Sequence, residues 1–116
     1  MSNQSIPLIN HFSAIVTLES LNKDFEVVKS AGEYIVKNLN LTIVQTLEHS
    51  FTPQGTTLIH LLSESHLALH TWPEYKTVHI NLLCGAELNP SEVKNVFKSS
   101  FDNLKISKFD FVEHKI

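Results

Sequence analysis

The sequence SESHLALHTWPEYKTVHINLLCG occupies residues 63–85 and contains the clearest local signals in the chain. Its two apolar runs, residues 65–70 and 77–84, are typical of β-strands. The intervening residues 71–76 include Pro73, which cannot donate a hydrogen bond to a sheet and therefore favours a turn. We predict two consecutive strands joined by a short connection.

The sequence before this stretch predicts three more strands, at residues 9–18, 41–48 and 56–62. Between the first two of these lies a helix at 23–38, for which Asn22 is the expected N-cap. Apolar residues recur along this segment at three- and four-residue spacing, which indicates an amphipathic helix. They are Phe25, Val28, Ala31, Ile35 and Leu39.

The sequence after this stretch predicts a second helix and a last strand. Asn89 followed by Pro90 is typical of a helix start, because proline at the first helical position lacks only an N–H that would be unpaired there. Apolar residues then recur on one helix face, at Val93, Val96, Phe97, Phe101 and Leu104. Residues 105–114 read as a strand, although their alternation is imperfect. The order β-α-β-β-β-β-α-β predicts the α+β class, a two-layer α/β sandwich with a mostly antiparallel sheet and two helices on one face.

Composition limits the classes of protein to which the chain could belong. Its 116 residues are 42% hydrophobic and 18% charged, and no repeat or linker divides them, so we expect one domain spanning 1–116. The nine basic residues are all lysine, and the net charge of -3 makes a nucleic-acid partner improbable. No apolar run approaches the roughly 20 residues that span a bilayer, and no signal segment precedes the first strand. We expect a soluble, cytoplasmic protein with no membrane partner.

One face of the predicted sheet is left without helices. The strands are apolar enough for this face to pack against a second copy of the chain, and we expect a homodimer.

Taken alone, the polar residues of 63–85 allow several readings. His66 and His70 lie four residues apart on a predicted strand, about 13 Å, which is too far for one metal ion, so we expect no metal site. Ser65 lacks the G-x-S-x-G turn of many hydrolases. Cys84, the one cysteine, either packs as a small apolar residue or takes part in chemistry. An ordinary core strand with no catalytic role remains an alternative.

The segments SESH, LALHTWPEY and CG together resemble the signature of the pyruvoyl-dependent S-adenosylmethionine decarboxylases of bacteria and archaea. The resemblance extends beyond this stretch: the family has a histidine in its first strand, a histidine–phenylalanine–proline–glycine loop and a VEH ending. Here the corresponding residues are His11, HSFTPQG at 49–55, and Val112-Glu113-His114. The resemblance therefore covers most of the chain.

The resemblance implies that the chain cleaves itself between Glu64 and Ser65, giving a β chain of residues 1–64 and an α chain of residues 65–116. Ser65 would become the pyruvoyl group, which serves as the electron sink for decarboxylation. His70 stands where the family has the histidine that assists processing, and Thr57 stands where the family has an assisting serine. Thr57 retains the hydroxyl.

Three further residues match family positions for turnover and substrate binding. Cys84 matches the proton donor, although the segment between Glu74 and Cys84 is one residue shorter than in the family. Such a shortening would turn Cys84 to the other face of its strand unless a bulge or a shorter turn near Lys76 compensates. Phe51 matches the phenylalanine that stacks on adenine, and Glu74 matches the carboxylate that binds the ribose. Without the resemblance, Phe51 could fold its loop onto the core and Glu74 could cap a turn.

The implied function is decarboxylation of S-adenosylmethionine for spermidine synthesis, with active sites at the interface of a homodimer of α/β pairs. Some residues depart from the family pattern: Ile15 replaces an acidic residue, Lys76 replaces a small one, and Asn81 stands near a usual aspartate. A pyruvoyl-dependent decarboxylase of ornithine or arginine on the same scaffold is therefore one alternative. An uncleaved, non-catalytic regulatory homologue is another.

Overall fold

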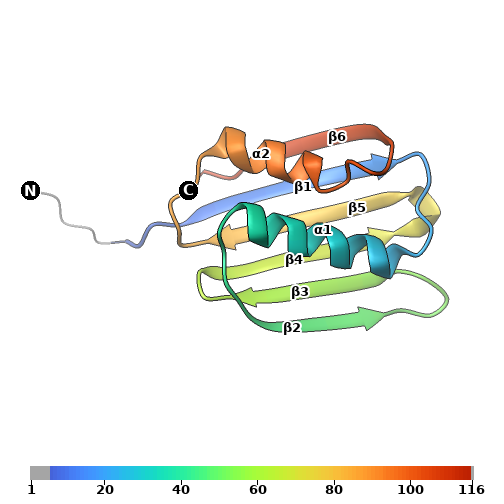
Figure 1. Ribbon diagram of the computed structural model, residues 1–116, viewed down its shortest axis with the longest axis horizontal. Coiled ribbons are helices and arrows are strands. Elements are labelled where there is room, and N and C mark those ends of the chain that lie inside the picture. The colour runs from blue at the N-terminus through green and yellow to red at the C-terminus, as the bar shows by residue number, and fades with distance from the viewer. Residues whose placement is uncertain (1–5, 116) are drawn as a thin grey trace, which may run out of the picture.

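The computed structural model describes residues 6–115 and has the predicted order of elements (Figure 1). They are β1 (Asn10–Leu18), α1 (Asp24–Asn38), β2 (Ile43–Ser50), β3 (Thr56–Leu62), β4 (Ser65–Trp72), the short 3-10 helix η1 (Pro73–Tyr75), β5 (Thr77–Cys84), α2 (Pro90–Ser99) and β6 (Ile106–Glu113).

The six strands form one sheet in the order β2-β3-β4-β5-β1-β6, and every neighbouring pair is antiparallel. Both helices lie on the same face of this sheet (Figure 1). Helix α1 contacts β3 and β4, whereas α2 contacts β6. The predicted two-layer α/β sandwich with a mostly antiparallel sheet is confirmed. The connection that contains α1 leads from β1, which lies next to the edge strand β6, to β2 at the opposite edge of the sheet.

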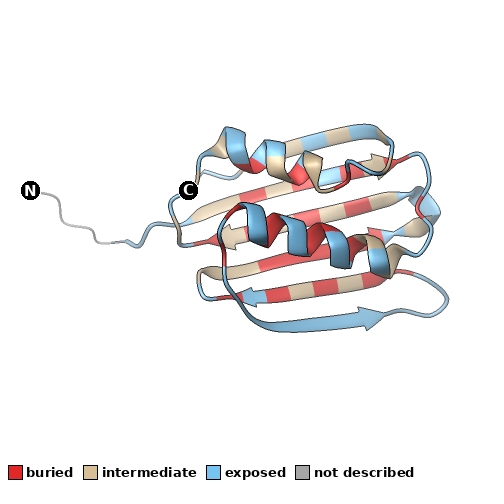
Figure 2. Ribbon diagram, in the orientation of Figure 1, coloured by how far each residue is buried: buried red, intermediate tan, exposed pale blue. Residues whose placement is uncertain are grey.

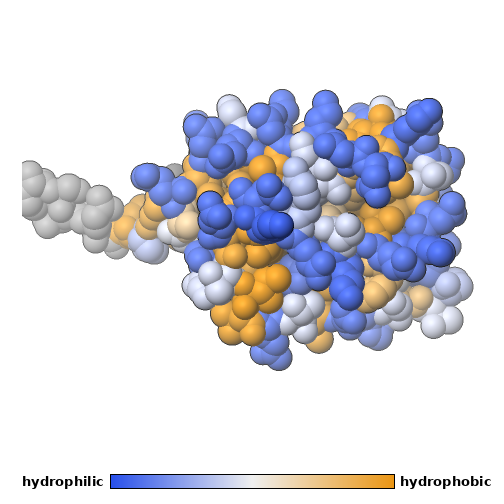
Figure 3. Space-filling model, in the orientation of Figure 1, coloured by the Kyte–Doolittle hydropathy of each residue, from blue (hydrophilic) through white to orange (hydrophobic). Residues whose placement is uncertain are grey.

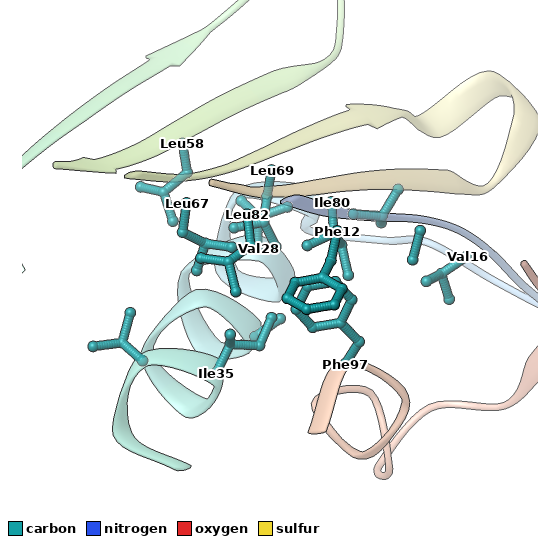
Figure 4. Packing of buried hydrophobic residues seen from close by; sticks show 14 of the residues in the cluster. Phe12, Val16, Val28, Ile35, Leu58, Leu67, Leu69, Ile80, Leu82 and Phe97 are labelled. Atoms are coloured by element: carbon teal, nitrogen blue, oxygen red, sulfur yellow. The ribbon is translucent and has the colours of Figure 1, made fainter. Parts of the chain in front are cut away.

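The hydrophobic core lies between the sheet and the two helices. Alternate residues of the central strands point into it, for example Leu67 and Leu69 of β4 and Ile80 and Leu82 of β5, all with 0% exposure (Figure 4). Figure 2 shows this alternation as buried residues that recur along the central strands. Each fully buried leucine or isoleucine side chain contributes about 1.5–3 kcal/mol of transfer free energy. The outer surface over the helices is mostly hydrophilic (Figure 3).

The two helices begin differently. The Asn89 side chain accepts a hydrogen bond from the Glu92 backbone N–H at 3.2 Å, and Pro90 follows it, so the predicted start of α2 is confirmed. The prediction that Asn22 caps α1 is wrong. Lys23 occupies the cap position in a left-handed conformation (φ 52°) and its side chain makes no capping hydrogen bond. Asp24 is therefore the first residue of the helix. Its carboxylate accepts hydrogen bonds from the hydroxyls of Thr56 and Thr71 in the sheet.

Strand ends differ from the prediction by one or two residues. Strand β2 covers 43–50 instead of 41–48, because the turn that ends α1 continues through Asn40 (φ 56°) and buries Leu41. Strand β4 extends to Trp72, two residues past its predicted end. Within residues 6–115, no helix is long and apolar enough to cross a membrane.

Candidate active site

The predicted cleavage site lies in the tight turn between β3 and β4. Leu62 and Ser65 pair across these strands, and residues 63 and 64 form the turn. The Glu64 carbonyl accepts a hydrogen bond from the Gly85 N–H at 2.7 Å, and the Glu64 carboxylate accepts one from the Thr42 N–H at 3.1 Å. Ser65 has a positive φ of 147°, which is rare for a residue with a side chain. The Glu64–Ser65 peptide is therefore firmly held in an unfavourable conformation.

Cys84 lies directly opposite Ser65 in the antiparallel pair of β4 and β5. Its side chain is 1% exposed and its sulfur accepts a hydrogen bond from the Ala86 N–H at 3.4 Å. Burial raises the pKa of the Cys84 thiol, and the nearby Glu64 carboxylate raises it further, while the Ala86 hydrogen bond acts in the opposite direction. The thiol is consequently neutral at physiological pH and carries a proton that it can donate.

The segment between Glu74 and Cys84 is one residue shorter than in the family, and the turn between β4 and β5 compensates for the missing residue. Lys76 ends η1 in a left-handed conformation (φ 53°), and β5 then runs without a bulge in register with β4 from Thr77 to Cys84. Cys84 therefore points toward the helices with Leu82, on the buried face of the sheet.

A second group of predicted residues gathers at the other end of β4. Thr57 and His70 are paired across β3 and β4, and the Thr57 hydroxyl lies 2.8 Å from Nδ1 of His70. Burial lowers the pKa of His70, which keeps the imidazole neutral and able to accept a proton at pH 7. Thr57 holds the ring in one orientation through Nδ1 and leaves Nε2 to react.

The residues matched to substrate binding lie around a hollow of about 350 Å³ beside Thr57 and His70. This volume suits a small organic ligand. Phe51 is 53% exposed and its ring meets the edge of His49 at 4.5 Å between centroids, so the phenyl face is not folded into the core. The lining residues are Phe51, Gln54, Gly55, Thr56, Thr57, His70, Thr71, Trp72 and Glu74.

Within one chain the two groups do not meet. Ser65 and His70 are five residues apart on β4, about 16 Å at the usual rise of a strand. Moreover, His70 lies on the face of the sheet without helices, whereas Cys84 lies on the helix-covered face. The structure thus forms two separate groups of predicted site residues. One group contains Glu64, Ser65 and Cys84. The other contains Phe51, Thr57, His70 and Glu74.

The face without helices carries further histidines to which the sequence assigns no catalytic role. His79 is the cross-strand partner of His70, with ring centroids 6.5 Å apart, and its pKa is lowered by burial and by the neighbouring His70 and His114. His11, which matched the family, lies 3.0 Å from the Asn81 amide oxygen and 4.3 Å from the His114 ring. The alternation of His79 and Asn81 with apolar residues in 77–84 is the signal that could have placed both on this face.

Comparison with known proteins matches residues 15–113 to the family model of S-adenosylmethionine decarboxylase. The S-adenosylmethionine decarboxylase proenzyme of Archaeoglobus fulgidus is 39% identical over 88 residues, which is 75% of this chain and 76% of the relative. The proenzyme of Methanococcus aeolicus is 36% identical over 89 residues, covering 76% and 74% of the two chains. Some other relatives are matched over less of their length, down to 55% for that of Thermotoga maritima.

The fold also has a counterpart among solved structures. The adenosylmethionine decarboxylase from Aquifex aeolicus superposes with a TM-score of 0.68, covering 95% of this chain and 91% of that one, at 24% sequence identity.

The family match, on a one-sheet α/β sandwich in which a serine turn lies beside a buried cysteine, defines the chain as a carboxy-lyase. The chain belongs to the S-adenosylmethionine decarboxylase family.

Proposed function

We propose that this chain is a proenzyme that cleaves itself between Glu64 and Ser65 and then decarboxylates S-adenosylmethionine. The observation that carries the proposal is the placement of Ser65 at a strained turn, directly opposite the neutral thiol of Cys84. The names of the relatives, all S-adenosylmethionine decarboxylase proenzymes, support it. Cleavage would leave residues 1–64 as the β chain and residues 65–116 as the α chain.

The residues present fit a pyruvoyl group made from Ser65, because that serine follows a carbonyl fixed by Gly85 and is half-buried beside a proton donor. When formed, this group supplies an electron sink for the loss of carbon dioxide. Cys84 then protonates the substrate carbon that has lost its carboxyl group, and the product is the aminopropyl donor for spermidine synthesis. His70, kept neutral by burial and oriented by Thr57, is the base that completes maturation.

The hollow beside His70 has the chemistry expected of a site for a sulfonium nucleoside. Phe51 offers an exposed ring for adenine, and the Glu74 carboxylate can accept hydrogen bonds from ribose hydroxyls. An aromatic face and a negative charge also attract a sulfonium cation.

A homodimer explains how the two groups of residues could act together. The helix-free face exposes large apolar side chains of five strands, an arrangement that favours burial against another surface. A two-fold axis through the middle of that face would place the Ser65 end of β4 in one copy beside the His70 end in the other. For the two residues to meet, the backbone at the start of β4 would have to turn Ser65 from the helix-covered face toward the partner. The exposed apolar residues are Ile15, Leu47, Leu61, Trp72 and Val112.

The first experiment is an intact-mass spectrum of freshly purified protein. The expected result is two fragments, with residues 65–116 carrying a pyruvoyl cap. The cleaved sample is then incubated with S-adenosylmethionine, ornithine or arginine under reducing conditions that trap amine adducts. S-adenosylmethionine should add its mass to the 65–116 fragment. An adduct with ornithine or arginine only would contradict the substrate, and a single chain that traps nothing would contradict self-cleavage.

The shared site is tested by co-expressing two inactive variants with distinguishable masses. His70→Ala retains Ser65, and Ser65→Ala retains His70, so only a mixed dimer can combine the two in one site. We expect mature fragments of the His70→Ala chain to form when both variants are present and not when it is expressed alone. Equal maturation in both samples, or none in either, would contradict a site shared between copies.

A further inference from the structure

We propose that the backbone N–H of Gly85 stabilises the negative charge that develops on the Glu64 carbonyl oxygen during self-cleavage. The inference rests on the proposed cleavage at Glu64–Ser65 and adds a group to it. The role belongs to a backbone group, so a comparison of side chains with the motifs of a family does not reveal it.

The geometry of the turn carries the proposal. The Gly85 N–H donates to the Glu64 oxygen at 2.7 Å, short for a bond between two backbone groups. This bond extends the β4–β5 ladder one step past the Ser65–Cys84 pair, so both partners are held by the register of two central strands. The donor is thus aimed at the oxygen of the scissile peptide before any reaction takes place.

The backbone of Ser65 supplies a second, independent observation. Among residues 6–115 its φ of 147° is one of four positive values at non-glycine residues, and the other three, at Lys23, Asn40 and Lys76, lie between 52° and 56° in the ordinary left-handed region. A serine at 147° is strained, and such strain persists only where the surrounding structure imposes it. The strained residue contributes the nitrogen of the scissile bond, so breaking that bond releases the constraint.

The step balances without any external reactant. The Ser65 Oγ attacks the Glu64 carbonyl carbon, the π electrons of the carbonyl move to its oxygen, and the Gly85 N–H donates to the resulting oxyanion. The Ser65 hydroxyl proton passes to the Ser65 nitrogen as the C–N bond breaks. The products are an ester between Glu64 and the Ser65 oxygen and a free amine on Ser65. The Gly85 hydrogen bond is strongest while the oxygen is negative, and it therefore lowers the barrier.

Cys84, the one cysteine in the sequence, allows the Gly85 N–H to be removed by chemical ligation without changing any side chain. A synthetic peptide of residues 84–116 can be ligated through Cys84 to a thioester of residues 1–83. The test chain carries glycolate in place of Gly85, which replaces the N–H by an oxygen, and the matched control carries Gly85 itself. Cleavage is followed by mass after refolding, with circular dichroism as the check on structure.

We expect the glycolate chain to cleave about 10²- to 10³-fold more slowly than the ligated control, the usual effect of losing one oxyanion donor. Neutral hydroxylamine, which cuts esters, should release no fragment that ends at Glu64, because the block precedes the Glu64–Ser65 ester; the one cut expected falls at the introduced ester after Cys84. Equal cleavage rates in the two ligated chains would overturn the role of Gly85. If the control itself stays intact under conditions where it folds, the proposed function fails instead.

Two substitutions at Gly85 provide a second test of the role of its N–H. The Cβ of an alanine at Gly85 would lie 3.5 Å from the Glu64 oxygen and 3.7 Å from the Leu8 oxygen, both ordinary contacts. Gly85→Ala retains the N–H, whereas Gly85→Pro lacks it. We expect Gly85→Ala to cleave at least about 10²-fold faster than Gly85→Pro; similar rates in two folded variants would contradict the proposal.

Discussion

Ser65 and Cys84 lie directly opposite each other at the ends of β4 and β5. The two strands are joined only at their other ends, through η1, so the β4–β5 pairing brings together residues 19 positions apart. One cross-strand pair thus combines the serine proposed as the source of the pyruvoyl group with a protonated thiol. It also places the Gly85 N–H on the carbonyl of Glu64, immediately beyond the pair.

Replacing Ser65 by alanine should abolish cleavage, because alanine has no hydroxyl to attack the Glu64 carbonyl. Intact-mass spectrometry should then show one chain of 116 residues. The matched control is Ser63→Ala in the same turn, where the side chain is exposed and the backbone N–H bonds to Thr42. Two fragments from Ser65→Ala, or an uncleaved Ser63→Ala, would contradict the assignment of Ser65.

Changes at His70 and Thr57 should affect maturation to different extents. His70→Ala removes the base and should slow maturation by about 10²- to 10⁴-fold at the ester stage, where hydroxylamine cuts the chain. Thr57→Val removes one hydrogen bond to His70 and should slow maturation by up to about tenfold.

Thr57→Ser is the control for this pair because it retains the hydroxyl, and it should mature faster than Thr57→Val. Normal maturation of His70→Ala would show that another group acts as the base.

Cys84→Ala should leave cleavage intact but lower turnover by about 10²- to 10⁴-fold, because the proton donor is lost. Since burial raises the pKa of the thiol, it stays protonated to higher pH than an exposed cysteine. The alkaline decline of kcat in the unchanged protein should therefore lie above the ordinary range of thiol pKa values. A pH profile of kcat checks this, and unchanged turnover in Cys84→Ala would exclude the thiol as donor.

Phe51→Ala and Glu74→Gln should raise the KM for S-adenosylmethionine by about tenfold each, since each removes one stacking or hydrogen-bonding contact. Both residues line the hollow beside His70 and neither touches the turn at Ser65, so cleavage should be unaffected. Phe51→Tyr keeps an aromatic face and serves as the control. A normal KM in Phe51→Ala would place the adenine elsewhere.

The stability of the fold should fall in mild acid because of His60. This side chain is 3% exposed beneath α1, and its Nδ1 lies 2.8 Å from the Thr46 hydroxyl. Its Nε2 finds no hydrogen-bond partner within the described part of the chain, residues 6–115. Burial lowers its pKa in the folded state, with Glu33 and Glu48 partly opposing this effect. The unfolded chain therefore binds a proton at this position more readily, and the His60 contribution to the free energy of unfolding decreases as the pH falls below about 6.5, while this contribution is constant above.

Urea denaturation between pH 5 and pH 8 measures this slope. His60→Gln should reduce it. Because burial also lowers the pKa of His70 and His79, part of the slope should remain in His60→Gln. An identical slope with and without His60 would contradict the prediction.

The sequence by itself determined the order of the strands and helices and the α+β class. Apolar periodicity and the Asn89–Pro90 start are local signals, because periodicity marks the face that must be buried and capping involves only neighbouring residues. The motif at 63–85 also identified Glu64, Ser65, His70 and Cys84 as the residues of interest. The start of α1 was mispredicted because Asp24 makes contacts with Thr56 and Thr71, which are distant in the sequence.

Only the tertiary structure decided which of these residues share a site. A shift of one residue turns a side chain to the other face of a sheet, so the direction of Cys84 depended on how the turn at Lys76 absorbed the shortened segment. Strand pairing then put Ser65 with Cys84, and Thr57 and His79 with His70, on opposite faces and at opposite ends of β4. These relations depend on hydrogen-bond register between strands, a property of the assembled sheet.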